Sequence, residues 1–220
     1  MNRDDRIVSM GPKINTVILL FILLGSMNCS SETGDNSDHN PASPLPSLKE
    51  NDSFDSESEL ARLNRILELE KENADIFYNR GWVYDYRGEL NKAKKDYTRA
   101  IELDNRHVDA YFNRGRIFFK NNEFKKAIED FSKAIELNPE FSDAFCNRGN
   151  AFFRLGKTTQ ALDDYNAALK INSDDPDIYY NRAAIYLALG KRSKADSDLK
   201  KAAQLGHEMA QKYLDGKEDY

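Results

Sequence analysis

The sequence predicts an all-α protein built from a helical unit that repeats every 34 residues. Asparagine-arginine pairs, two columns of alanine and several columns of large apolar residues share this spacing, which is the signature of a repeat protein. Stacked units of this kind bury their apolar faces against their neighbours and share one continuous core. The clearest columns are Asn79-Arg80-Gly81, Asn113-Arg114-Gly115, Asn147-Arg148-Gly149 and Asn181-Arg182-Ala183; Ala93, Ala127, Ala161 and Ala195; Ala100, Ala134, Ala168 and Ala202; and Tyr97, Phe131, Tyr165 and Leu199.

Each unit is divided by a residue that tolerates a left-handed backbone. Gly88, Gly156 and Gly190 hold this place in three units, and Asn122 holds it in the second. The small residues at the glycine and alanine columns allow two helices to approach closely, and the aromatic residues fill the space between them. The pattern therefore predicts a first helix (A), a tight turn and a second helix (B) in every unit.

At these residues the chain resembles the tetratricopeptide repeat (TPR) family. The resemblance implies an all-α TPR solenoid, a right-handed superhelix of antiparallel helix pairs, with four full repeats at 74–107, 108–141, 142–175 and 176–209. The ends of such a solenoid need caps. We expect a degenerate half repeat at 59–73, with a lone B helix from Glu59 to Lys71, and a short capping helix with a frayed tail at 210–220, where Gly216 follows the last apolar residues.

The start of the chain resembles the export signal of a bacterial lipoprotein. Basic residues precede an apolar run of eight residues, 17–24, which is shorter than the roughly 18 to 20 that a membrane-spanning helix needs. We therefore expect a cleaved signal peptide at 1–28, with translation starting at Met1 or Met10. The resemblance implies lipidation of Cys29, a membrane anchor through palmitate-type acyl chains. The alternative is an uncleaved leader with a chance cysteine.

Residues 29–58 are rich in Ser, Asp, Asn and Pro and poor in apolar residues, so we expect a disordered tether. A lipidated, tethered protein would lie in the cell envelope, on a bacterial membrane. Ser30 and Ser31 weakly favour the outer membrane. Lipidation of Cys29 would leave Cys146 as a free and inert thiol, and the alternative is a bridge between these two cysteines.

Composition argues against several functions. The formal net charge is −5, whereas nucleic-acid binding requires a clustered positive face, so no nucleic-acid partner is expected. His39, His107 and His207 belong to no metal-binding or catalytic constellation, and no phosphate-binding glycine loop is present. We expect no metal, no cofactor and no enzymatic activity.

The resemblance implies that the A helices line a concave groove and that the sixth repeat position faces it. That position is always asparagine, whose amide can donate to and accept from a peptide backbone. Helices about 10 Å apart would let each amide meet about every third residue of an extended peptide, which advances about 3.3 Å per residue. Aromatic residues of the A helices could add anchor pockets. The peptide-binding candidates are Asn79, Asn113, Asn147 and Asn181, with Tyr78, Phe112, Tyr180, Trp82, Phe119 and Phe153.

Each candidate also has a purely structural interpretation. The amides could bond between neighbouring helices, and the aromatic residues could pack against adjacent A helices. An acidic column at the second position, Asp75, Asp109, Asp143 and Asp177, is favoured by the dipole at a helix N-terminus. Arginine and aspartate recur sixteen residues apart, from Arg80 and Asp96 onward, and this spacing predicts structural ion pairs between helices A and B.

These observations predict a membrane-anchored adaptor that binds a protein partner or an extended peptide in its groove. The family's clamp for chaperone tails requires basic residues where this chain has Tyr78, Asp143 and Asn147, so a chaperone-tail receptor is not expected. The alternative is a structural envelope protein that associates with further copies of itself.

Overall fold

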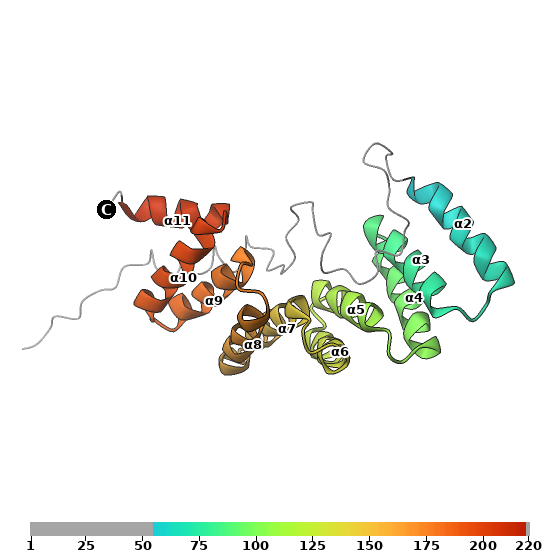
Figure 1. The fold of residues 1–220 in the computed structure, drawn as a ribbon, viewed down its shortest axis with the longest axis horizontal. Coiled ribbons are helices and arrows are strands. Elements are labelled where there is room, and N and C mark those ends of the chain that lie inside the picture. Colours follow the sequence, from blue (N-terminus) through green and yellow to red (C-terminus); the bar gives the residue numbers. More distant parts are fainter. Residues whose placement is uncertain (1–54, 219–220) are drawn as a thin grey trace, which may run out of the picture. The chain divides into compact units, whose positions relative to one another are not determined.

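The computed structural model describes residues 55–218, which form ten helices and no strands (Figure 1). The predicted all-α class is therefore confirmed. The predicted signal peptide, Cys29 and most of the predicted tether lie outside the described residues. Within the described part of the chain, no helix is both long and apolar enough to span a bilayer. The described helices fall into two compact units, one ending at Ser173 and the other beginning at Asp174.

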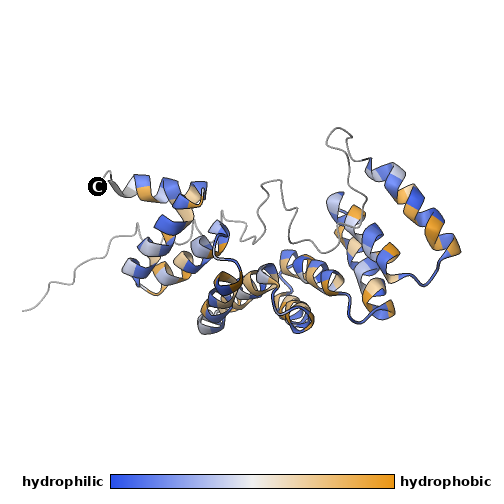
Figure 2. Cartoon of the chain, viewed as in Figure 1, coloured by the Kyte–Doolittle hydropathy of each residue, from blue (hydrophilic) through white to orange (hydrophobic). Residues whose placement is uncertain are grey.

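The first unit holds a lone helix followed by three antiparallel pairs. In each pair the A helix packs along the B helix that follows it, as the neighbouring ribbons in Figure 1 show. Apolar residues gather on the sides of the helices that face one another, and polar residues cover the outer sides (Figure 2). The helices are α2 (Ser56–Leu69), α3 (Ala74–Tyr86), α4 (Leu90–Leu103), α5 (Val108–Lys120), α6 (Phe124–Leu137), α7 (Ser142–Arg154) and α8 (Thr158–Ile171).

The turns between A and B helices have the backbone conformation that the sequence predicts. Gly88, Gly156 and Gly190 have φ values of 73°, 73° and 69°, and Asn122 has φ 60°. Asparagine is among the few residues besides glycine that adopt this left-handed conformation at low cost. The second repeat can therefore make the same tight turn without a glycine.

The glycine of each A helix allows an aromatic ring of the B helix to lie directly against its backbone. A Cβ atom built on Gly115 would lie 2.8 Å from the Phe131 ring, and one built on Gly81 would lie 2.9 Å from the Tyr97 ring. Both rings are fully buried, as are the alanines that flank them on the same B helices. The predicted packing role of the glycine, alanine and aromatic columns is thus confirmed in these repeats.

Helix α2 begins at Ser56, three residues before the predicted start at Glu59, and ends at Leu69 rather than Lys71. Asp55 is its N-cap, and the Asp55 carboxylate accepts a hydrogen bond of 3.1 Å from the backbone N–H of Glu57. The prediction followed the apolar register and overlooked this capping aspartate. Leu63 is fully buried, so α2 covers the apolar side of the first repeat.

The second unit consists of one further pair and a closing helix: α9 (Pro176–Ala188), α10 (Arg192–Gln204) and α11 (Glu208–Glu218). Asp175 caps α9 and Pro176 occupies its first turn, where a missing N–H costs nothing. Ala210 is fully buried and Tyr213 and Leu214 pack beside it, as a capping helix requires. Helix α11 continues through Gly216 to Glu218, so the interpretation of Gly216 as its end is wrong.

Replacing Gly115 with alanine should destabilise the protein by about 1–3 kcal/mol, because the new methyl group would collide with the buried Phe131 ring. Urea unfolding of the full chain, followed by circular dichroism, measures this effect. Gly216→Ala is the matched control, since nothing lies within 4 Å of a Cβ atom there. Equal stability of the two variants would contradict the close approach.

Candidate functional site

The periodic ion pairs lie between the A and B helices, as predicted. In every repeat the arginine Nε and Nη2 atoms donate to the two carboxylate oxygens of the aspartate sixteen residues later, at 2.7–2.9 Å. Burial raises the pKa of the Asp130 carboxyl, and the hydrogen bonds from Arg114 oppose that rise. Because desolvation offsets much of the attraction in such a pair, its main contribution is a fixed geometry. The structural role of these residues is confirmed.

The remaining guanidinium nitrogen reaches the B helix of the preceding repeat. Arg114 Nη1 donates to Thr98 Oγ1 at 3.2 Å, and Arg148 Nη1 donates to Ser132 Oγ at 3.0 Å. Arg80 makes the equivalent bond to Asn64 of α2, at 2.9 Å. Helix α2 therefore occupies the place of a B helix. Sequence reasoning missed this second set of partners.

The four column asparagines are buried, with only 3–9 % of their surface exposed. Asn113 Nδ2 donates to Tyr78 Oη at 3.1 Å and its Oδ1 accepts from Arg116 Nη1 at 3.3 Å, whereas Asn147 Nδ2 donates to the Asp143 carbonyl at 2.9 Å. These bonds show that the amides take part in the fold. Asn79 Oδ1 is buried without a hydrogen-bond partner in the structure. Peptide binding by this column remains a prediction.

The predicted aromatic residues divide into packed and partly accessible groups. Tyr78 and Phe112 are 4 % and 8 % exposed, and Phe112 packs against the Phe131 and Phe141 rings. Their main role in this structure is packing. Four others are half-buried, so part of each ring lies at the surface of an A helix. They are Trp82, which stacks on Tyr86, Phe119, which contacts Phe124 edge to face, Phe153 and Tyr180.

Sequence reasoning also missed a role for two histidines. Each lies directly before a helix and caps it: His107 Nδ1 accepts from the Ala110 N–H at 3.3 Å, and His207 Nδ1 accepts from the Ala210 N–H at 3.2 Å. Each ring also packs on the tyrosine at the fifth position of its own repeat, His107 on Tyr78 and His207 on Tyr180. The available signal was a histidine next to an expected helix start, but the linkers that hold the two histidines differ in length.

The acidic column lies in the first turn of each A helix, where the helix dipole favours negative charge. Burial nevertheless raises the pKa of Asp109, and burial together with Asp175 raises the pKa of Asp177 to about 6. Asp75 is 84 % exposed at its side chain. The carboxylates of the column therefore differ widely in their contact with solvent.

Cys146 is fully buried on α7 and is disulfide-bonded. The expectation of a free, inert thiol is therefore wrong. The sequence contains one other cysteine, Cys29, which lies outside the described residues. Among the described residues, no group of three or more His, Cys, Asp and Glu side chains is arranged to hold a metal ion.

Models of the tetratricopeptide repeat match the sequence at 74–107, 108–141, 131–163, 149–190 and 176–205. The chain belongs to the tetratricopeptide repeat family. TPR proteins generally serve as scaffolds for interactions with other proteins. A comparison with curated protein sequences finds no match.

Several solved TPR structures share the fold. YrrB, described as a TPR protein with an unusual peptide-binding site, is 25% identical, with a TM-score of 0.64 over 73% of this chain and 84% of YrrB. MamA is 24% identical, with a TM-score of 0.64 over 69% of this chain and 89% of MamA. Pseudomonas aeruginosa pilF is 23% identical, with a TM-score of 0.64 over 69% of each chain. The likeness to MamA and pilF shows the fold alone.

Acidification should weaken the second unit through His207. Burial lowers the pKa of His207, and an Nδ1 atom that accepts a hydrogen bond must be unprotonated. The unfolded chain therefore binds the proton first, and stability falls as the pH drops through about 6.5 towards the lower pKa of the folded state. His207→Asn keeps a good capping residue without a titrating ring.

The measurement is the free energy of unfolding in urea at pH 7.5 and pH 5.0 for both chains. The decrease in the free energy of unfolding between pH 7.5 and pH 5.0 should be smaller for His207→Asn than for the wild type. Asp177 Oδ1 lies 3.4 Å from His207 Nε2, and the raised pKa of Asp177 adds stability as the pH falls below about 6. The same comparison in an Asp177→Asn background removes this second titration. An equal loss in the two chains would refute the role of His207.

Proposed function

We propose that this TPR protein is a membrane-anchored adaptor that binds an extended segment of a partner protein on its A-helix surface. The A-helix surface is defined here within the first unit, by Asn79, Asn113 and Asn147 together with half-buried Trp82, Phe119 and Phe153. It acts by binding and not by catalysis. The peptide-binding site described for YrrB supports a binding role for a chain of this fold.

One observation carries the proposal: three aromatic rings on the A helices stay half-buried although other residues hold the repeats together. The hydrogen bonds of the repeating arginines, the buried alanines and the glycine contacts join the helices, and the Asn113–Tyr78 bond adds a contact between two A helices. Trp82, Phe119 and Phe153 are only partly covered. Large rings that the helix pairs do not fully cover are suited to anchoring apolar side chains of a partner.

The asparagine column contributes differently along the chain. Asn113 already uses both ends of its amide within the protein, whereas Asn79 retains a buried acceptor without a partner. Because this oxygen is covered by the protein, a backbone N–H of a bound segment could pair with it only after the Asn79 side chain turns towards solvent. Asn79 therefore contributes to binding only through such a rearrangement.

Replacing Asn79, Asn113, Asn147 and Asn181 with alanine should reduce capture of specific partners at least tenfold, since each hydrogen bond contributes about 0.5–1.5 kcal/mol. The measurement is quantitative pull-down from envelope extract with the tagged full chain, with folding checked by circular dichroism. The matched control changes four exposed asparagines, Asn91, Asn105, Asn121 and Asn172, to alanine. Unchanged capture by the folded column variant would move binding to another surface, and capture of this chain alone would favour self-association.

The membrane anchor has its own test. Acyl chains contribute about 0.8 kcal/mol for each buried methylene, so Cys29→Ser should shift the protein from the detergent phase to the aqueous phase and abolish labelling with palmitate. Ser30→Ala is the control. A lipid would occupy the Cys29 sulfur, so a lipidated chain could not also bridge Cys29 to Cys146. Mass spectrometry that finds Cys29 bridged to Cys146 in the mature protein would refute the anchor.

A further inference from the structure

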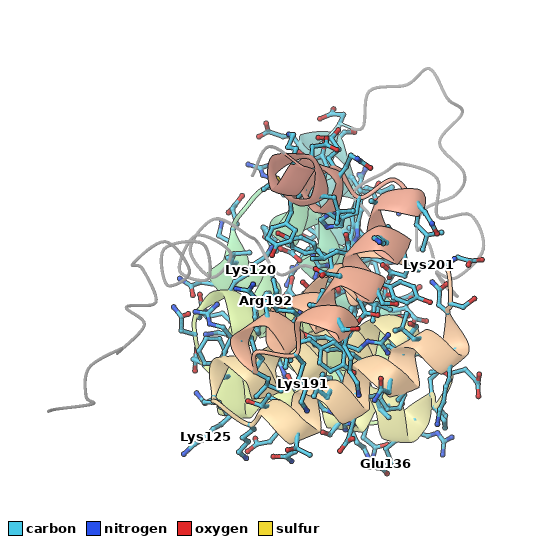
Figure 3. All side chains as sticks on the ribbon, turned by 90° about the vertical axis from the view of Figure 1, so that its left-hand side faces the viewer. Lys120, Lys125, Glu136, Lys191, Arg192 and Lys201 are labelled. Carbon is cyan, nitrogen blue, oxygen red and sulfur yellow. The ribbon has the colours of Figure 1, made fainter. Side chains whose placement is uncertain are left out.

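Charge is separated between the two ends of the helices in the first unit. We define the turn edge as residues 85–93, 119–127 and 153–161, which include the A–B turns, and the junction edge as residues 67–75, 101–109 and 135–143, which connect successive repeats. In helices α3 to α8 the turn edge carries seven basic and three acidic residues, whereas the junction edge carries two basic and ten acidic ones. The start of α2, which lies at the same end of the helices as the turn edge, adds three acidic residues, Asp55, Glu57 and Glu59. Figure 3 shows Lys120 and Lys125 on one side and Glu136 on the other.

The turn edge forms one continuous surface. Lys120 Nζ lies 3.7 Å from Asp85 Oδ1, which joins the first and second turns. Arg154 Nη2 donates to Asn122 Oδ1 at 3.2 Å, and its guanidinium lies 4.7 Å from the Phe124 ring centroid, so the third turn contacts the second. The basic side chains of three repeats therefore act together.

The acidic residues of the turn edge are already paired. Glu89 binds Arg87 and Lys92, Glu123 binds Lys126, and Asp85 faces Lys120. Within residues 55–218, Lys125, Arg154 and Lys157 have no carboxylate partner, and all three are exposed. These side chains leave a net positive surface in contact with solvent.

Helix stability accounts for Lys120 and Arg154, which lie in the last turns of α5 and α7, where the dipole favours positive charge. It does not account for the cations at the starts of the B helices. Lys125 and Lys126 lie in the first turn of α6, which contains no acidic residue, and Lys157 precedes the first turn of α8. Positive charge is unfavourable at a helix N-terminus, where the dipole is also positive. In the second unit the fourth turn has the same character, with exposed Lys191, Arg192 and Lys194. An external anion would offset this repulsion.

We propose that the turn edge docks on a membrane surface rich in anionic phospholipid. This rests on the proposed anchor, which would hold the protein beside a membrane. A chain with a net charge of −5 is repelled as a whole by such a surface, but screening limits the interaction to about 10 Å at 0.1 M salt. Lys125 and Glu136 are eleven residues apart on α6, about 16 Å along the helix. The membrane therefore attracts the near turn edge and is screened from the acidic junction edge.

The test uses residues 29–220, the expected mature chain, with Cys29→Ser, so that neither an acyl chain nor the apolar and basic residues of the predicted signal peptide contribute to binding. Sedimentation with vesicles of phosphatidylcholine, with and without phosphatidylglycerol, measures the preference for the anionic lipid. The test variant changes exposed Lys120, Lys125 and Lys157 to glutamine. The matched control changes Lys71, Arg106 and Lys170, which are also exposed and lie towards the opposite ends of the helices, to glutamine.

In the turn-edge variant, the ratio of the binding constants for vesicles with and without phosphatidylglycerol should fall at least tenfold. Each basic residue near such a surface raises the binding constant about fivefold. The control, with the same net charge, should retain the preference, and circular dichroism should show both folded. No preference in the parent chain, or an equal loss in the two variants, would overturn the proposal. Because this chain carries no lipid, the result is independent of whether Cys29 is acylated or a partner binds the A-helix surface.

Discussion

The fold of the first unit depends on an arginine that joins two B helices at once. Arg114 holds Asp130 of its own repeat through two nitrogens and Thr98 of the preceding repeat through the third. Aromatic rings of the same A helix flank the guanidinium, at 5.7 and 5.8 Å from Tyr111 and Phe118. This planar, always charged group fixes both distances, which a lysine could not do. Gly115 lets the Phe131 ring lie against the backbone of this repeat, and the same pair of arginine–aspartate hydrogen bonds forms in the fourth repeat with Ala183 in the glycine position.

This arrangement separates the residues that build the repeat from those that vary along the A-helix surface. The position of Trp82 holds arginine in the second repeat and asparagine in the third, whereas the paired arginine and aspartate are the same in every repeat. Asn113 belongs partly to both groups, because its amide bonds to Tyr78 of the preceding repeat. A column that is regular in sequence can therefore be regular for packing reasons, and its regularity alone does not establish binding.

The 34-residue period was sufficient to predict the helix pairs, the left-handed turns and the arginine–aspartate pairs, because each depends on a residue, or on a close substitute such as Asn122 for glycine, that recurs at a fixed position. The partners of the third arginine nitrogen escaped prediction because their residue types differ, asparagine at 64, threonine at 98 and serine at 132. The capping roles of His107 and His207 could not be predicted from the period, because the linkers before α5 and α11 have different lengths. The burial of the asparagines depends on neighbouring helices, which no spacing within one repeat reveals.

Docking through the turn edge would also orient the A-helix surface of the first unit. The helices would stand with the turn edge on the membrane and the acidic junction edge pointing away from it. Asn113 lies seven residues before Lys120 on α5, about 10 Å along the helix. A segment crossing the A helices would then run parallel to the membrane, about 10 Å beyond the turn edge. The separated charges would thus leave the A-helix surface open along the membrane plane, where a partner in the same membrane could reach it.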